Sequence, residues 1–258
     1  MIALADCNNF YVSCEQIFNP KLKNKPVVVL SNNDGCIISR SNEAKLLGIQ
    51  MGAPKFKVQN ILDKYNVHVF STNLTLYGDI SNRVMSILSN NVPEIEIYSI
   101  DEAFINLKGI TNKKKFSLML RSKILKYTGI PISIGIGPTK VLSKLANYIA
   151  KKEPSHICYL RDNKIIHNKL KLFPINNVWG IGKNLTKRLN SYGIINAYDL
   201  INKNDIWIKN NLNISILKIA KELKGKSCLK IQTTYNDKKS ITVSRTFSKK
   251  ITSFTKLA

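Results

Sequence analysis

The chain contains 258 residues, of which 40 are Lys or Arg and 16 are Asp or Glu, so its formal net charge at pH 7 is +24. A hydrophobic content of 44% is normal for a packed globular protein, which excludes a disordered chain, and the length allows two or three small domains. No apolar run approaches the roughly 18 residues of a membrane span, and the N-terminus lacks a signal-peptide pattern. We therefore expect a cytoplasmic protein without a membrane partner.

The positive charge favours an anionic polymer as partner, because each phosphate that a protein neutralises releases counterions. The chain is also rich in Lys, Asn and Ile together, as A/T-biased coding would produce, so part of the lysine content could be solvated surface. The cysteines are scattered and odd in number, which predicts reduced, mostly buried thiols and no disulfide framework or zinc site. They are Cys7, Cys14, Cys36, Cys158 and Cys228. The three histidines have no plausible ligand or nucleophile beside them in sequence.

Strands and helices mix through the first 155 residues. β-Branched and apolar runs predict strands, and apolar residues at helical spacing predict helices. The expected strands span residues 1–10, 25–30, 36–39, 94–107 and 131–136, and the expected helices span 41–47, 79–88, 116–127 and 139–152. This mixture predicts a sheet domain of the α/β or α+β class.

From about residue 160 the chain changes to helical segments joined by polar loops, which predicts a separate helical module centred on Val178–Lys183. The polar stretch 233–239 has the composition of a linker, and residues 240–247 regain strand character shortly before the last residue, Ala258.

Two acidic sites interrupt strand-like segments. Asp6 ends an apolar run, and Asp101 and Glu102 are adjacent within the alternating run Tyr98–Phe104. Converging carboxylates can hold the two magnesium ions used in phosphoryl transfer. Successive strand residues point to opposite faces, so both acids of the pair can contribute only where the backbone bends, as near a hairpin turn. The alternative is that the pair faces solvent in an ordinary hairpin and that Asp6 caps the following helix.

Four motifs in this order resemble those of the Y-family translesion DNA polymerases. They are ADCNNFY at 5–11, SRSNEAK at 39–45, YSIDEAF at 98–104 and GIGPTK at 135–140. Residues 30–36 and 244–247 most resemble the UmuC-like branch of that family. The resemblance implies an α+β fold: a palm domain with a mixed or antiparallel sheet flanked by helices, small fingers, and a helical thumb with a helix-hairpin-helix.

The resemblance also implies the domain boundaries. The palm would comprise 1–10 and 73–160, the fingers 11–72, and the thumb 161–232. A linker would follow at 233–240, and 241–258 would be the start of a C-terminally truncated little-finger domain.

By the same resemblance, Asp6, Asp101 and Glu102 are the catalytic acids that bind two Mg²⁺ ions, with the backbone carbonyl of Cys7 as a further ligand. Phe10 and Tyr11 would belong to the nucleotide site. Tyr11 matches the steric-gate position, where an aromatic ring beneath the sugar clashes with a 2′-hydroxyl. The alternative for Tyr11 is a core aromatic on the helix after Asp6.

Lys140, Lys144 and Lys151 follow one another at spacings of four and seven, which places them on one face of the helix expected at 139–152. A lysine stripe on an amphipathic helix is usually its solvated face. The resemblance instead aligns Lys151 with a lysine that holds the incoming triphosphate.

Arg40, Asn42 and Lys45 are similar in position to fingers residues around the same phosphates. Many relatives have an aromatic residue and an arginine where this chain has Asn42 and Lys45. Monodentate lysine contacts would therefore replace a bidentate arginine fork.

Gly180, Gly182 and Lys183 lie between helical patterns, with Lys187 one turn further on. Small glycines let backbone N–H groups approach a phosphate, and the lysines add charge, which is the chemistry of a helix-hairpin-helix that contacts the DNA backbone. The alternative is a plain turn between two helices.

The leading hypothesis is a magnesium-dependent, template-directed translesion DNA polymerase of the error-prone, SOS type. Its partners would be primer-template DNA and dNTPs and, by resemblance, a UmuD-like subunit, a recombinase filament and a sliding clamp. The first alternative is a truncated, non-catalytic remnant that binds DNA or a partner. A palm-domain nucleotide cyclase is disfavoured by the glycine hairpin and by the helix that leads to Lys151.

Overall fold

The computed structural model describes residues 1–233, 240–242 and 252–253, and the chain divides into two compact units. The first comprises Met1–Asn8 and Ile80–Thr233, and the second is built from Asn9–Asp79. The predicted linker at 233–240, the strand at 240–247 and the start of a further domain at 241–258 lie largely outside the described residues. The names palm, fingers and thumb stay predictions.

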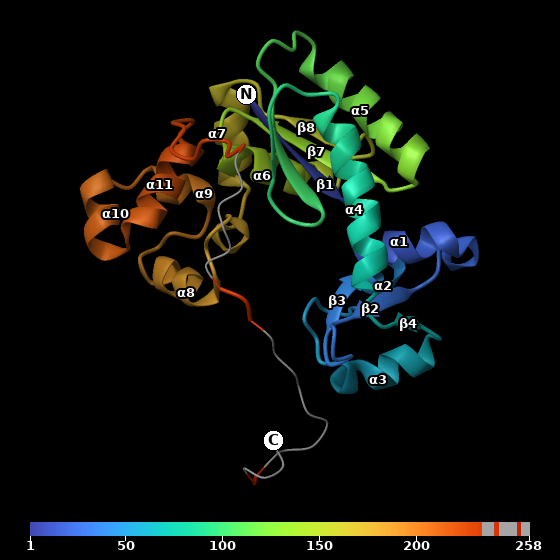
Figure 1. The fold of residues 1–258 in the computed structure, drawn as a ribbon. Coiled ribbons are helices and arrows are strands. Elements are labelled where there is room, and N and C mark those ends of the chain that lie inside the picture. Colours follow the sequence, from blue (N-terminus) through green and yellow to red (C-terminus); the bar gives the residue numbers. More distant parts are fainter. Residues whose placement is uncertain (234–239, 243–251, 254–258) are drawn as a thin grey trace. The chain divides into compact units, whose positions relative to one another are not determined.

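The first unit is built on a five-stranded sheet in the order β5-β6-β1-β7-β8 (Figure 1). In that order the strands are Ile95–Ile97, Glu102–Asn106, Ile2–Cys7, Ile132–Gly137 and Ile157–Tyr159. Neighbours are antiparallel except β7 and β8, which are parallel. The predicted α+β class with a mixed sheet is confirmed.

The prediction of a single strand at 94–107 is wrong. The chain forms two strands, β5 and β6, with a turn at residues 98–101 between them. The turn closes because the backbone N–H groups of Tyr98 and Ser99 both donate to the carbonyl oxygen of Glu102, at 3.0 and 3.2 Å. Apolar alternation continues across the turn, so the sequence pattern did not reveal the break.

Helix α6 (Lys140–Ala150) packs very closely against β7. A Cβ atom at Gly135 would lie 2.0 Å from the backbone nitrogen of Asn147, and one at Gly137 would lie 2.9 Å from Leu142. Only glycine permits this approach, since any larger residue would push the helix off the sheet. Asn147 strengthens the contact, because its Nδ2 donates to the carbonyl oxygens of Leu4 (3.2 Å) and Ser133 (2.8 Å).

Strand register places the acidic residues on the same face of the sheet as α6. Leu4 lies opposite Gly135, whose missing Cβ would point into α6. Asp6 lies two residues beyond Leu4 and opposite Glu102 of β6. Side chains alternate along a strand and directly opposed residues share a face, so Asp6 and Glu102 both project toward α6.

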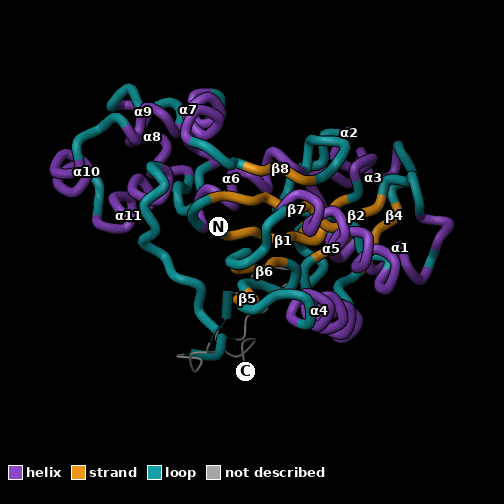
Figure 2. Tube along the Cα trace, turned by 90° about the horizontal axis from the view of Figure 1, so that it is seen from above, coloured by secondary structure: helices purple, strands orange, loops and turns teal. Residues whose placement is uncertain are grey.

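The opposite face of β7 is also covered. Ile134 and Ile136 point away from α6 and are 1% and 0% exposed. Helix α5 (Lys113–Thr128) contacts both β7 and β8. Figure 2 shows the five strands side by side with these helices around them. The sheet is therefore buried on both faces at its centre.

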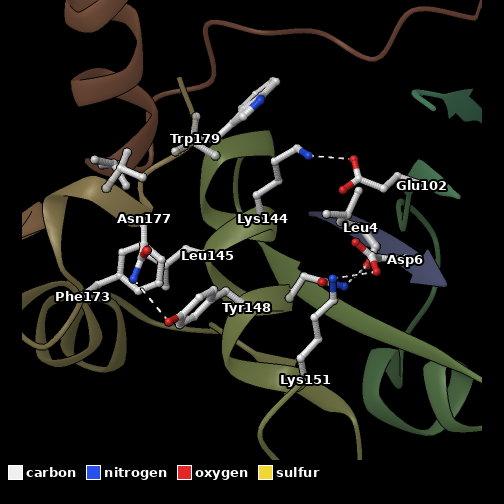
Figure 3. A pocket seen from close by; sticks show the side chains of 14 residues that line it. Leu4, Asp6, Glu102, Lys144, Leu145, Tyr148, Lys151, Phe173, Asn177 and Trp179 are labelled. Atoms are coloured by element: carbon white, nitrogen blue, oxygen red, sulfur yellow. Dashed lines mark hydrogen bonds and ion pairs between the residues drawn. The ribbon is translucent and has the colours of Figure 1, made fainter. Parts of the chain in front are cut away.

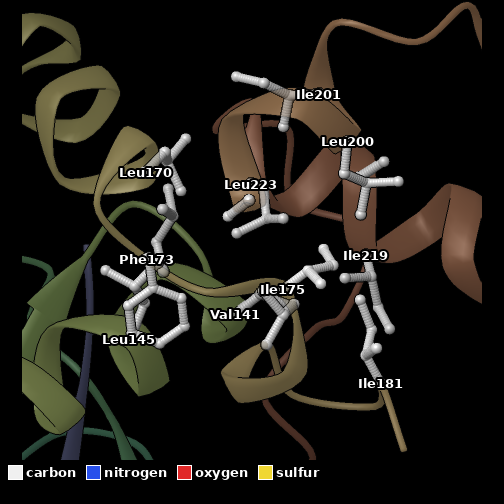
Figure 4. Packing of buried hydrophobic residues seen from close by; sticks show 14 of the residues in the cluster. Val141, Leu145, Leu170, Phe173, Ile175, Ile181, Leu200, Ile201, Ile219 and Leu223 are labelled. Atoms are coloured by element: carbon white, nitrogen blue, oxygen red, sulfur yellow. The ribbon is translucent and has the colours of Figure 1, made fainter. Parts of the chain in front are cut away.

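The helices expected after residue 160 are present, but they do not form a separate unit, because they belong to the same compact unit as the five-stranded sheet. The helical module contains α7 to α11, which span Asn163–Lys171, Lys183–Ser191, Ala197–Ile201, Asp205–Asn211 and Ile214–Leu223, and the short 3-10 turn η2, Ile175–Asn177. Its core is continuous with α6: Val141 and Leu145 pack with Leu170, Phe173 and Leu223 (Figure 4). Helix α6 is thus shared between the sheet and the helical module.

The second unit has a three-stranded sheet in the order β3-β2-β4, with β2 antiparallel to β3 and parallel to β4. Its strands are Val27–Leu30, Ile37–Arg40 and His68–Phe70 for β2, β3 and β4, and its helical segments are α1 Phe10–Phe18, η1 Pro20–Leu22, α2 Asn42–Leu46 and α3 Lys55–Lys64. The hairpin and the short helix expected before Gly48 are confirmed.

Helix α4 spans Leu74–Ser89, so it starts before the expected 79–88. The reason is a cap, because the side chain of Asn73 accepts a hydrogen bond from the backbone N–H of Leu76 at 3.1 Å. Within the part of the chain that the structure describes, no helix has the length and apolar character needed to cross a membrane. All five cysteines are free, and Cys7, Cys14 and Cys158 are buried.

Glu222 of α11 is a fully buried carboxylate that joins three segments. Its Oε1 accepts hydrogen bonds from the backbone N–H groups of Cys228 (2.5 Å) and Leu229 (2.8 Å), and its Oε2 accepts one from Val141 (3.2 Å). Val141 lies in the first turn of α6, so Glu222 fastens α11 and the segment after it to that helix.

We expect Glu222→Ala to lower the free energy of unfolding by roughly 2–4 kcal/mol, because one buried and two partly buried N–H groups lose their acceptor. Urea denaturation followed by far-UV circular dichroism measures this change. Glu153→Ala, in the turn after α6, is the matched control and should change the free energy by no more than about 0.5 kcal/mol. Equal stability of the two variants would contradict the role given to Glu222.

Candidate active site

The structure brings the three predicted acids together at one end of the sheet. Asp6, near the end of β1, is 4% exposed and lies opposite Glu102, the first residue of β6. Asp101 precedes Glu102 in the turn, and its carbonyl oxygen accepts a hydrogen bond from the backbone N–H of Cys7 at 2.9 Å. The bend required for both acids of the pair to contribute is present. The alternative role of Asp6 as a helix cap is wrong, because Asn9 occupies the N-cap position of α1.

Two lysines from α6 and its C-terminal end reach these acids (Figure 3). Lys151 Nζ lies 2.7 Å from Asp6 Oδ1, and Lys144 Nζ lies 2.8 Å from Glu102 Oε2. Their side chains are 44% and 16% exposed, respectively. Lys140, one turn before Lys144, is buried and pairs with Glu96. The interpretation of the three lysines as a solvated stripe is therefore wrong for Lys140 and Lys144.

Burial and mutual repulsion control the charge of the acids. The pKa of Asp6 is raised to about 7, chiefly by burial; the ammonium of Lys151 opposes the rise, and the charges of Glu102 and Asp101 contribute to it. The pKa of Asp101 is also raised, chiefly by burial, while a hydrogen bond of 2.7 Å from Ser99 Oγ acts in the opposite direction. The three carboxylates are thus close enough to influence one another.

This donor set has the chemistry that magnesium prefers, because carboxylate and backbone oxygens are hard ligands and a divalent cation would relieve the repulsion between the acids. Among the residues that the structure describes, no three Asp, Glu, His or Cys side chains already form a metal-binding cluster. The reason is visible in the contacts: Asp6 and Glu102 each reach a lysine, and Asp101 accepts from Ser99.

A pocket of about 220 Å³ opens beside the acids. One wall carries Asp6, Glu102, Lys144 and Lys151, and the other wall is mostly apolar. The apolar wall includes Val141, Leu145, Tyr148, Phe173, Val178, Trp179 and Leu223, whereas Leu4 lies beside Asp6 (Figure 3). The charged groups therefore lie at the edge of a cavity that excludes part of the surrounding water.

The predicted aromatic residues of the second unit differ from each other in burial. Phe10 is 3% exposed, so its ring belongs to the interior and direct contact with a nucleotide is not supported. The ring of Tyr11 is only half-buried and stacks on Tyr77, with centroids 4.5 Å apart and planes inclined by 17°. Tyr77 is fully buried and donates its hydroxyl to Glu15 at 2.7 Å. Tyr11 is thus held at a fixed position on α1 without being a core residue.

The predicted phosphate contacts of the second unit form a cluster around Asn9. Asn9 Nδ2 donates to Asn42 Oδ1 at 3.1 Å, and Lys45 Nζ donates to Asn9 Oδ1 at 2.5 Å. Asn9 adopts a left-handed backbone conformation, with φ of 49°. Arg40 lies apart from this cluster, since its guanidinium donates to the carbonyl oxygen of Ile49 at 2.7 Å.

The glycine hairpin starts with Gly180, which has φ of 85° and lies against Ile219. Gly182 is the N-cap of α8, and Lys183 is its first residue. A Cβ at Gly182 would meet no atom within 4 Å, so the backbone is open to solvent there. Gly182, Lys183 and Lys187 are all exposed, as contact with a phosphate backbone requires.

Sequence reasoning did not identify the pairing of Lys144 with Glu102 or the stack of Tyr77 on Tyr11. It also missed Asn9, whose side chain hydrogen-bonds with both Asn42 and Lys45. For the pairing of Lys144 with Glu102 there was a signal, because the helical spacing of Lys144 and Lys151 places both lysines on one face of the helix. Nothing in the linear sequence pointed to Tyr77, because its contact depends on the packing of α4 against α1.

Comparisons with known proteins give a consistent relationship. Residues 5–148 match the model of the impB/mucB/samB family. Protein ImpB of Salmonella typhimurium is 42% identical over 259 residues, which is 98% of this chain and 61% of that protein. Protein UmuC of Salmonella typhimurium strain LT2 is 42% identical over 98% of this chain and 62% of its own length. The chain thus spans about three fifths of the length of these curated relatives.

Solved structures agree with this relationship. An insertion ternary complex of Dbh DNA polymerase has a TM-score of 0.78 at 26% identity and covers 90% of this chain and 70% of that chain. The crystal structure of DinB from Sulfolobus solfataricus has a TM-score of 0.76, again at 26% identity over 90% of this chain and 70% of that chain. The shared fold, the order of the motifs and the extent of identity lead to one conclusion: the chain belongs to the impB/mucB/samB family and is a UmuC-like member of the Y-family of DNA polymerases.

Proposed function

We propose that this chain carries the catalytic centre of a template-directed, magnesium-dependent translesion DNA polymerase. In this reaction the 3′-hydroxyl of a primer attacks the α-phosphate of a dNTP, a new phosphodiester bond forms, and pyrophosphate leaves with the bonding electrons. The related structures include ternary complexes of Dbh DNA polymerase, which supports primer-template DNA and a nucleotide as substrates.

The observation that carries the proposal is the convergence of Asp6, Asp101 and Glu102 on neighbouring strands, with Lys144 and Lys151 beside them. Three buried or half-buried acids at one point cost folding stability and are retained where they serve a function. Lys151 is proposed to exchange its partner Asp6 for a triphosphate, because the side chain of Lys151 is 44% exposed and its ammonium reaches solvent.

The residues that would hold Mg²⁺ are Asp6, Asp101, Glu102 and the backbone carbonyl of Cys7. When bound, such ions polarise the phosphate and lower the pKa of the attacking hydroxyl. The protein's own contribution is to hold the acids close together and oriented and to keep one side of the site dry. The apolar wall around Phe173 and Trp179 serves the last purpose.

Contacts with the nucleotide and the duplex follow from the exposed groups. Tyr11 is proposed to contact the sugar, and Asn42 and Lys45 to contact the triphosphate from the fingers. Gly180, Gly182, Lys183 and Lys187 are proposed to contact the DNA backbone, because they combine an open N-terminal helix turn with positive charge. A UmuD-like subunit, a recombinase filament and a sliding clamp stay predictions from family membership.

The first prediction tests the acids. We expect Asp101→Asn and Glu102→Gln each to lower single-nucleotide addition by roughly 100-fold or more while the Kd for primer-template changes little, because the acids hold metal and not the duplex. Primer extension and fluorescence anisotropy measure the two quantities. Glu94→Gln, an exposed acid of the same hairpin, should behave as wild type. If wild type extends no primer at saturating enzyme, low salt and excess magnesium, the chain is a non-catalytic binding protein.

The second prediction concerns pH. Asp6 has its pKa raised to about 7, so it must lose a proton before it binds a cation. We therefore expect Mn²⁺ affinity, measured by electron paramagnetic resonance as a probe for Mg²⁺, to fall as the pH is lowered from about 8 to about 6. Lys151→Met should move the midpoint to higher pH, because the ammonium that lowers the pKa of Asp6 is lost.

Lys152→Met is the control for this experiment, since Lys152 is the next residue and contacts the hydroxyl of Tyr148. It should leave the midpoint unchanged. A flat affinity across the pH range, or equal shifts in both lysine variants, would contradict the assignment of Asp6 as a metal ligand.

The third prediction concerns sugar selection. We expect Tyr11→Ala to raise the efficiency of ribonucleotide addition relative to deoxynucleotide addition by about 10-fold or more, because a clash with the 2′-hydroxyl is removed. Competitive single-nucleotide kinetics with matched dNTP and NTP measure the ratio. Tyr65→Ala, which removes an exposed tyrosine of the same unit, should leave the ratio unchanged. An unchanged ratio in Tyr11→Ala would show that this residue has only a packing role.

A further inference from the structure

Lys144 lies in an aromatic cage. Its Nζ is 4.7 Å from the ring centroid of Tyr98, 5.2 Å from that of Trp179 and 5.7 Å from that of Phe104. The rings also contact one another: the centroids of Tyr98 are 5.4 Å from Phe104 and 5.7 Å from Trp179, both in edge-on geometry. The cage therefore surrounds the ammonium with rings from the turn between β5 and β6, from the middle of β6 and from the loop before α8.

The cage leaves the ammonium one charged partner in the first unit, the carboxylate of Glu102 at 2.8 Å. A cation over aromatic rings is attracted to a defined position, more strongly when water is excluded, and the side chain of Lys144 is only 16% exposed. A flexible lysine is thereby held in one conformation. The fixed ammonium in turn fixes the orientation of Glu102.

Trp179 connects this cage to the glycine hairpin. It directly precedes Gly180, whose left-handed backbone conformation and close contact with Ile219 define the path of the chain into α8. The ring of Trp179 packs on Lys144, and the next three residues form the hairpin, in which Gly180 and Gly182 are exposed and Ile181 is buried. The hairpin and Glu102 are thus connected through the side chains of Trp179 and Lys144.

We propose that Lys144 is a positioning residue for the catalytic carboxylate of Glu102, and that Trp179 sets the position of Lys144 according to the state of the hairpin. Contact of the hairpin with a DNA backbone would then favour the aligned form of Glu102. This inference rests on the proposed polymerase function, which it extends by naming how duplex contact is transmitted to the acid.

Lys140 offers a matched control. It lies one helical turn before Lys144, is more enclosed than Lys144, pairs with Glu96 and lies 4.8 Å from the ring centroid of Phe104. Its carboxylate partner is not one of the candidate catalytic acids. Lys140→Met and Lys144→Met therefore remove the same kind of buried ion pair, and only the second removes the partner of Glu102.

The first measurement is single-turnover addition of one nucleotide with primer-template at saturation. We expect Lys144→Met to lower the rate by about 10- to 100-fold with little change in the Kd for DNA, because a misplaced catalytic group costs rate and not binding. Lys144→Arg should recover part of the rate, because it restores the charge. Trp179→Leu should lower the rate by about 3- to 30-fold, and less than additively in combination with Lys144→Met.

The second measurement does not depend on turnover. In a Trp207→Phe background, which removes the other tryptophan, the fluorescence of Trp179 should change on addition of primer-template with a midpoint equal to the Kd. Lys144→Met should alter the emission of the free protein, because the cation leaves the ring. Lys140→Met should alter neither the emission nor the DNA-induced change.

The outcomes separate this inference from the proposed function. If wild type and Lys140→Met extend the primer and a folded Lys144→Met extends it equally well, the positioning role is overturned and the polymerase function stands. Equal losses in both folded lysine variants would also overturn it, since the effect would be general to the ion pairs. If wild type itself extends no primer, the proposed function fails and this inference fails with it. Thermal melting of every variant establishes which of them are folded.

Discussion

The site depends on the close contact between α6 and the central strands of the sheet. Gly135 and Gly137 have no Cβ, so the helix backbone lies nearly in contact with β7. This approach brings the lysines of α6 and its C-terminal end within hydrogen-bond distance of acids on β1 and β6. A helix held at the usual side-chain distance from the sheet would leave these carboxylates buried and unpaired, which is costly.

The electrostatic arrangement follows from this geometry. Asp6 and Glu102 face each other across two strands, and Asp101 is tied to β1 through the backbone N–H of Cys7. Burial is the main reason that the pKa of Asp6 rises to about 7, and the repulsion from Glu102 and Asp101 adds to it. The lysines offset part of the cost of burial and repulsion. A divalent cation would offset more of it, which is why the proposed metal and the observed lysines suit the same place.

The helical module is connected to α6 by hydrogen bonds and by apolar packing. Glu222 accepts hydrogen bonds from the first turn of α6 and from the segment after α11, and the apolar core runs from α6 through Phe173 to Leu223. The hairpin at Gly180–Lys183 therefore belongs to a body that also holds the acids and their lysines. Contact of the hairpin with a DNA duplex can be linked to the orientation of Glu102, because α6 packs against the helical module and also carries Lys144.

The sequence by itself determined the class of the fold and most of the strands and helices, and it pointed to the three acids that the structure brings together. Apolar periodicity and turn residues are local properties, and the acidic motifs are short and ordered, so both can be read from a linear chain. Asp6, Asp101 and Glu102 were candidates because charge within strand-like runs is unusual. The need for a bend beside Glu102 also followed from strand geometry alone, although the turn that splits the run 94–107 did not.

Only the tertiary structure decided which charges meet. The lysine stripe has the pattern of a solvated face, yet Lys140 and Lys144 are enclosed, because they meet Glu96 and Glu102, which are more than 40 residues away in the sequence. The burial of Phe10, the stack of Tyr77 on Tyr11 and the cage around Lys144 likewise join residues distant in sequence. Such contacts depend on how separate elements pack, and side-chain periodicity within one element carries no information about its neighbours.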